Sequence, residues 1–86
     1  MRHQVVWSAE AYRSLQRIWD EAFDREKIAD AIDEIHEALA EHADERGESR
    51  PNGSRIFFAS PLGIAFWANE RATAVEIRAV WIFQRV

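Results

Sequence analysis

The stretch that decides the fold is residues 54–83, which read SRIFFASPLGIAFWANERATAVEIRAVWIF. A Pro-Leu-Gly sequence at residues 61–63 and a polar segment at residues 69–71 divide it into three apolar runs, and both dividers are typical of turns. Alternation of apolar residues with smaller or polar ones predicts a three-stranded antiparallel meander with one buried face. The expected buried residues are Ile56, Phe58, Ile64, Phe66, Val75, Ile77, Ala79, Trp81 and Phe83.

Two amphipathic helices are expected before this meander. Apolar residues recur at helical spacing after Ser8 and again after Asp24, and each of these two residues is a suitable N-cap. Residues 5–7 predict a short strand, placed most simply beside the last strand, and residues 44–53 predict a polar loop. The order predicts an α+β fold: an N-terminal strand, a helical hairpin packed on one sheet face, then the meander.

Length and composition fit one small domain spanning residues 1–86. The chain has 86 residues, of which 48% are hydrophobic and 30% charged, so an ordinary globular core is expected. It contains no cysteine, which excludes disulfides and cysteine–zinc sites. No apolar run resembles a signal peptide or a membrane span, so we expect a cytoplasmic protein that does not contact a membrane.

Charge is distributed unevenly along the chain. The net charge of −4 argues against a general nucleic-acid-binding protein. Residues 1–45 hold five Lys or Arg and twelve Asp or Glu, a balance of −7, whereas residues 46–86 hold six Arg and three Glu, a balance of +3. An anionic partner would therefore meet the sheet half, although a solvated acidic helix face is commonplace.

The whole pattern resembles the RelE/ParE superfamily, the toxins of type II toxin–antitoxin modules of the plasmid-stabilisation type. The resemblance covers nearly the whole chain and consists of residue types in order rather than an invariant motif. The stretches that carry it are Val5–Leu15, Arg25–Leu39, Ser54–Phe58, Pro61–Phe66 and Val75–Trp81.

The resemblance implies partners and two alternative activities. A cognate antitoxin would cover the toxin with a helix or an added strand. The RelE-like branch cuts mRNA on the ribosome, which requires proton transfer and stabilisation of a phosphorane charge. The ParE-like branch inhibits DNA gyrase and requires no catalytic site. Neither activity implies a cofactor.

The sequence departs from the ribonuclease pattern in three ways. Gly63 is the position that best matches the usual arginine of the middle strand in the ribonucleases. Residues 80–83, Val-Trp-Ile-Phe, stand where those enzymes often carry His or Arg followed by Tyr. The chain is also acidic, whereas ribosome-directed members are typically basic. If it is nevertheless a ribonuclease, the candidate catalytic residues are Arg50, Arg55, Arg78 and Arg85.

A cluster of arginines could hold phosphate, but the commoner role of any single arginine is to protect a sheet edge from pairing with another chain. The three histidines lack the spacing of a metal site, so no metal is expected.

Phe57 and Ile82 have the opposite strand parity to Phe58 and Trp81, which places apolar residues on both sheet faces. The expected partner-binding residues are Phe57, Trp67, Arg78, Ile82 and Arg85.

Three hypotheses follow from the sequence. The first is a toxin, or a toxin-like relative, that acts by protein binding and is neutralised by an antitoxin. The second is a ribosome-dependent mRNA endonuclease with an unusual site. The third is a small interaction domain without toxicity, for example a homodimer formed through the exposed sheet.

Overall fold

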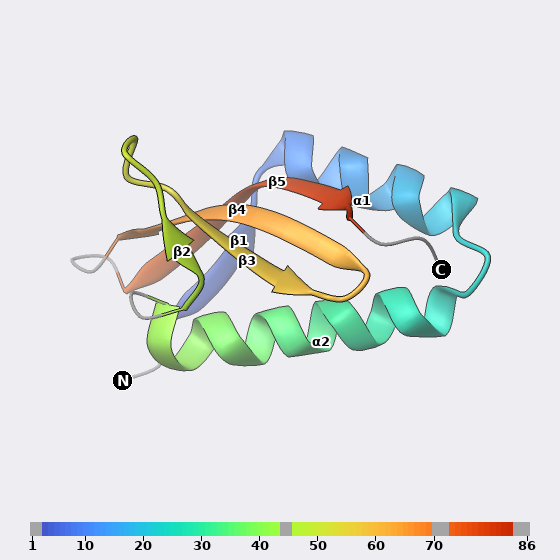
Figure 1. Ribbon diagram of the computed structural model, residues 1–86, viewed down its shortest axis with the longest axis horizontal. Helices are drawn as coiled ribbons and strands as arrows, with labels where there is room; N and C mark the ends of the chain where they lie inside the picture. The colour runs from blue at the N-terminus through green and yellow to red at the C-terminus, as the bar shows by residue number, and fades with distance from the viewer. Residues whose placement is uncertain (1–2, 44–45, 70–72, 84–86) are drawn as a thin grey trace.

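The computed structural model describes residues 3–43, 46–69 and 73–83. In this part of the chain it has two helices and a mixed sheet, whose arrangement can be followed in Figure 1. The elements follow in the order β1 (Gln4–Trp7), α1 (Ala9–Glu21), α2 (Arg25–His42), β2 (Glu48–Ser49), β3 (Arg55–Ala59), β4 (Leu62–Asn69) and β5 (Ala74–Ile82).

The sheet has the strand order β1-β5-β4-β3-β2. Strands β3, β4 and β5 form the antiparallel meander and β1 lies beside β5, as the sequence predicted. The pairing of β1 with β5 is parallel. Strand β2 was not predicted, because its two polar residues lie in what reads as a loop. The α+β fold and the position of the first strand are confirmed.

Both helices begin where the sequence predicted. The Ser8 hydroxyl accepts a hydrogen bond from the Ala11 amide at 3.1 Å, and the Asp24 carboxylate accepts one from the Lys27 amide at 3.3 Å. These side chains satisfy amide donors that the first turn of a helix leaves free. The helices run antiparallel in Figure 1, with α2 along the lower edge of the view.

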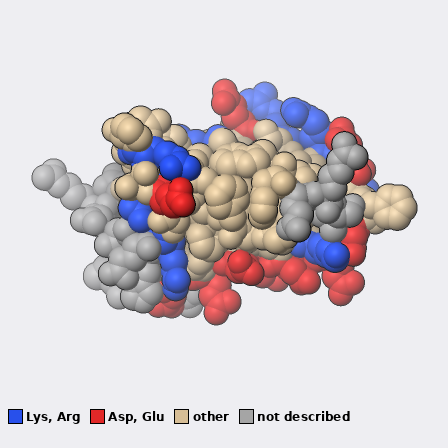
Figure 2. All heavy atoms as spheres, in the orientation of Figure 1, with Lys and Arg blue, Asp and Glu red and all other residues tan. Residues whose placement is uncertain are grey.

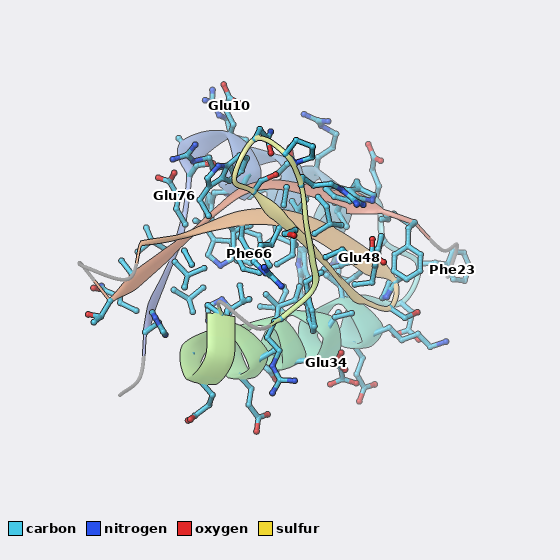
Figure 3. The ribbon with its side chains drawn as sticks, turned by 60° about the vertical axis from the view of Figure 1, so that its left-hand side comes forward. Glu10, Phe23, Glu34, Glu48, Phe66 and Glu76 are labelled. Carbon is cyan, nitrogen blue, oxygen red and sulfur yellow. The ribbon has the colours of Figure 1, made fainter. Side chains whose placement is uncertain are left out.

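One hydrophobic core joins both helices to the same face of the sheet. Phe66 is fully buried at its centre, and Figure 3 shows it between the strands and α2. The helices therefore cover one face, the core face, and leave the other face without a second layer. The core residues are Ala11, Ile28, Ala31, Ile35, Leu39, Ala43, Ala59, Leu62, Ile64, Phe66, Val75, Ile77 and Val80.

A register shift in β5 changes which of its residues face the helices. Ala65 pairs with Ala79, but the next residue of β4, Phe66, pairs with Ile77, so Arg78 has no partner on β4. Such a bulge reverses the alternation of side chains beyond it. Val80 is therefore buried against the helices.

The prediction that Ala79, Trp81 and Phe83 continue the buried set was therefore wrong. Ala79 and Trp81 pair with Ala65 and Gly63, which lie between core-facing residues of β4. Phe83 is half-exposed. Ile82 was expected on the opposite face, but it pairs with the buried Leu62.

The alternation in β3 was also assigned to the wrong phase. Phe57 pairs with the buried Ile64 and packs against the core, whereas the sequence analysis placed it on the second face. Ile56 and Phe58 pair with Ala65 and Gly63 and face away from the helices. The run is apolar at consecutive positions, so its period of two does not by itself say which residue is buried.

Strand β1 is joined to α2 by a pair of aromatic side chains. The Trp7 indole N–H donates to Nε2 of His36 at 2.9 Å, and the ring centroids lie 6.0 Å apart. An indole N–H can only donate, so Nε2 of His36 is the acceptor in this contact. The His3 amide also donates to the Ala40 carbonyl of α2, at 2.7 Å.

No helix among the described residues combines the length and the apolar character that a membrane crossing requires.

We predict that Trp7→Phe and His36→Phe each lower the free energy of unfolding by about 1 kcal/mol, because either change removes the hydrogen bond and keeps a ring. Urea denaturation of both variants and of the double variant measures this. The double variant should lose less than the sum of the two single losses.

The matched control is Trp19→Phe, at a partly exposed position, combined with the same His36→Phe change. Its effects should add within about 0.5 kcal/mol. Strict additivity between Trp7→Phe and His36→Phe would contradict the assigned hydrogen bond.

Candidate functional site

The candidate site is the outer face, the side of the sheet that points away from both helices. Its position follows from strand register, because each of these residues neighbours a core-facing residue along its own strand. Figure 2 shows uncharged side chains over the strands in the middle of the view. The outer face comprises Ile56, Phe58, Gly63, Ala65, Trp67, Glu76, Arg78, Ala79 and Trp81.

An aromatic cluster of Phe58, Trp81 and Phe83 lies at the end of the outer face where β5 ends. The Phe58 ring contacts Trp81 edge-on, with centroids 6.4 Å apart, and Phe83, with centroids 4.9 Å apart. Phe58 is 47% exposed and Phe83 is 46% exposed. Edge-to-face contacts hold the rings in a fixed arrangement while much of their apolar surface stays in water.

Gly63 makes this cluster possible. It lies between Phe58 and Trp81 in the register of the three strands. A Cβ atom at Gly63 would lie 2.6 Å from Nε1 of Trp81, so the indole lies directly over the glycine backbone. The position that matches the ribonuclease arginine therefore has no space for a side chain, because Trp81 occupies it.

A charged group lies beside Trp67, farther along the outer face. The Arg78 guanidinium stacks over the Trp67 ring at 4.4 Å from its centroid, and Nε of Arg78 donates to the Glu76 carboxylate. Cation–π contact and ion pair together fix the guanidinium in place. Arg78 is the bulge residue, so the register shift also positions this cation.

The other candidate arginines have different partners. Arg50 pairs with the Glu48 carboxylate at 3.3 Å, and both side chains are largely exposed. Arg55 donates from Nε to the Arg46 carbonyl at 2.6 Å and from Nη2 to the Gly47 carbonyl at 3.0 Å. Arg55 thus ties the loop after α2 to β3, which is a structural role.

The turn that carries Arg50 lies beside Trp67, because a Cβ at Gly53 would be 4.0 Å from Nε1 of Trp67. The Gly53 amide donates to the Arg50 carbonyl at 3.0 Å and closes this turn. Arg50 and Arg78 are therefore both carried by segments that border Trp67. Arg85 lies outside the described residues.

The expected partner-binding residues fall in different places. Trp67 and Arg78 lie on the outer face, whereas Phe57 and Ile82 belong to the side of the helices. Phe58, Trp81 and Phe83 form the apolar part of the face, and none of the three was among the expected partner-binding residues. The signal that could have found them is Gly63, because a strand glycine often marks a close approach by another group.

Groups for proton transfer are few at this site. Glu48 and Glu76, the carboxylates beside it, each pair with an arginine. His3 and His36 lie at the junction of β1 and α2. Within the described residues, no three His, Cys, Asp or Glu side chains gather in a way that could hold a metal ion. The outer face thus presents exposed aromatic side chains beside arginines that already have partners.

In comparisons of sequence, no protein-family model matches the chain, and no curated protein matches it.

Comparison with solved structures finds toxin–antitoxin complexes. A chain of the RelBE2 complex from Mycobacterium tuberculosis superimposes with a TM-score of 0.76 at 17% identity, over 95% of this chain and 99% of that one. A chain of the chromosomal ParDE system from P. aeruginosa gives 0.67 at 18% identity, over 96% and 98%. A chain of the intact E. coli RelBE complex gives 0.51 at 15% identity, over 96% and 99%.

These likenesses establish the fold. Sequence identities of 15–18% are low, but the superpositions cover almost the full length of both chains. The chain has the RelE/ParE-like fold that its sequence resembles. Both RelBE and ParDE complexes are among the matches, so the fold is shared by the two groups and does not select one activity.

We predict that Gly63→Ala lowers the free energy of unfolding by about 1–3 kcal/mol, because the added methyl group displaces the Trp81 indole. In a Trp81→Ala background the same change should cost less than about 0.5 kcal/mol. Urea denaturation monitored by circular dichroism measures both values. An equal cost in the two backgrounds would show that the indole does not lie over Gly63.

Proposed function

We propose that this chain is the toxin of a type II toxin–antitoxin module, that it acts by binding a protein target, and that an antitoxin neutralises it. The fold shared with chains of RelBE and ParDE complexes supports the module. The exposed aromatic cluster on the outer face is the observation that supports action by protein binding.

The cluster has the properties of a binding hot spot. Aromatic side chains dominate such sites, and they contribute most when they are pre-arranged and become fully desolvated on binding. Phe58 and Phe83 expose about half of their surface although the Phe58 ring is held against two neighbours. A protein partner that covers the cluster would bury apolar area without first ordering it.

The charged groups also favour binding of a protein target over cleavage of mRNA. Two of the candidate arginines, Arg50 and Arg78, are paired with carboxylates, and Arg55 is bound to backbone carbonyls. A phosphate would have to compete with these partners. The net charge of −4 also opposes binding to a polyanion such as the ribosome.

The proposal includes the setting expected from the sequence resemblance. The protein would work in the bacterial cytoplasm as part of a plasmid-stabilisation-type module, and DNA gyrase is the first target to test. The antitoxin would be encoded by the neighbouring reading frame.

We predict that induction of the chain in a bacterial host arrests growth and that co-expression of the neighbouring gene restores it. Phe58→Ala together with Trp81→Ala should abolish the arrest, because the apolar contact surface is lost. Phe23→Ala, at an exposed aromatic position in the turn between the two helices, is the matched control and should keep the arrest. Growth curves and circular dichroism of each purified variant check activity and folding.

Cleavage of ribosome-bound mRNA by the wild type, abolished by Arg50→Ala or Arg78→Ala, would replace this proposal with the ribonuclease alternative. Normal growth with the wild type well expressed would favour the interaction domain without toxicity.

A further inference from the structure

The junction between β1 and α2 is held by two hydrogen bonds that differ in chemistry. The Trp7 indole N–H donates to Nε2 of His36, and the His3 amide donates to the Ala40 carbonyl. Figure 1 shows the start of β1 beside the last turns of α2. Amide and carbonyl groups do not titrate, whereas an imidazole nitrogen takes up a proton near neutral pH. Proton uptake can therefore change one of these two contacts without changing the other.

His36 accepts from Trp7 only as a neutral ring. A neutral imidazole has one N–H and one free lone pair, and an indole N–H can only donate. Because Nε2 of His36 is the acceptor, the hydrogen of the neutral ring lies on Nδ1. A second proton, taken up at Nε2, would set an N–H against the indole N–H, with the two nitrogens 2.9 Å apart. The charged ring cannot keep this arrangement.

A surface pocket beside His36 offers the charged ring other partners. The pocket has a volume of about 540 Å³, and His36 is half-buried in its wall. Glu37, an exposed residue, brings a carboxylate to the same pocket. A charged ring that turns away from Trp7 can therefore donate to water or to a carboxylate. The lining residues are His3, Val5, His36, Glu37 and Ala40.

The charged and titratable groups around His36 act in both directions. On α2, Glu37 shares the pocket, and Asp33 precedes His36 by three residues, which makes it a neighbour on the helix surface. Both carboxylates attract a proton to His36. Strand β1, with the sequence QVVW, contributes no charged side chain. Before β1, His3 has its Nδ1 buried without a partner among the described residues, and a charge on His3 would oppose one on His36.

We propose that the Trp7–His36 pair is a proton-sensitive latch between β1 and α2, closed while His36 is neutral and open when it is charged. Opening is confined to this junction, because β1 remains paired with β5. The Ser8 amide, directly after β1, donates to the Ile77 carbonyl of β5 at 2.9 Å. The latch lies apart from the outer face and does not depend on toxicity or on the target.

The sign of the pH dependence follows from proton linkage. The open junction accepts a proton at Nε2 of His36 and the closed junction does not, so the open state binds more protons. The contribution of the latch to stability is therefore complete where histidine is neutral. It is lost as the pH falls through the range of about 8 to 5 in which histidine side chains titrate.

NMR spectroscopy of the full-length protein between about pH 8 and pH 5 tests the latch. The ring protons of His36 report its charge, and the indole N–H of Trp7 reports the hydrogen bond. We expect the Trp7 signal to shift with the midpoint of His36. Opening of this N–H to solvent should increase by about fivefold or more, as loss of one hydrogen bond predicts. The indole N–H of Trp19, on α1, is the internal control and should not follow this midpoint.

Two variants separate the latch from other titrating groups. His36→Gln keeps an acceptor for the indole that does not titrate, and His3→Gln removes the other histidine of the pocket. Between about pH 7.5 and pH 5.5, the unfolding equilibrium constant from urea denaturation should rise about fivefold more in the wild type than in His36→Gln. His3→Gln should keep the pH-dependent shift of the Trp7 signal.

Three outcomes would overturn the proposal. A Trp7 indole signal that stays constant while His36 titrates would show that the charged ring remains on the indole. Equal pH dependence of unfolding in the wild type and in His36→Gln would show that the pair is not the titrating element. Loss of the Trp7 shift in His3→Gln would assign the effect to His3. These measurements are independent of the growth-arrest experiment, so failure of one does not imply failure of the other.

Discussion

The register shift at Arg78 determines what each side of the sheet presents. Before it, Val75 and Ile77 face the helices, and after it Val80 does so. An uninterrupted β5 would turn Trp81 toward the core and Val80 toward water. The extra residue instead delivers a β-branched side chain to a closely packed interior and a large aromatic side chain to the surface.

Several features of the outer face depend on this shift. With Trp81 turned outward, only a residue without a side chain fits at Gly63, and the indole then reaches Phe58. Arg78 itself is released from the ladder and stacks on Trp67. The absence of an arginine at position 63 and the presence of Trp81 are therefore one structural fact rather than two independent departures from the ribonuclease pattern.

The sheet presents an apolar surface on the side that points away from the helices. The outer face carries the aromatic cluster, with Arg50 and Arg78 bordering Trp67.

Local signals in the sequence predicted the fold well, because each acts over a few residues. Ser8 and Asp24 cap helices through side-chain oxygens that reach the next turn, and the alternation around Ile64 and Phe66 reports a buried strand directly. The phase of β3 could not be predicted, since Phe57 and Phe58 are equally apolar and only pairing with β4 distinguishes them.

Features that depend on contacts between distant segments could not be predicted from the sequence either. The bulge at Arg78 leaves no local signature, because Ala79, Val80 and Trp81 are all apolar. The role of Arg55 depends on carbonyl groups of a loop that lies next to it only in the folded chain. The aromatic cluster likewise brings together residues from β3 and from the end of β5.

The central claim is that the outer face binds protein. Photo-crosslinking tests it most directly, with Phe58 replaced by p-benzoylphenylalanine and irradiation of living cells during growth arrest. The predicted result is a covalent adduct with a protein target, identified by mass spectrometry and lost when the antitoxin is co-expressed. Adducts confined to ribosomal RNA or mRNA would contradict the claim.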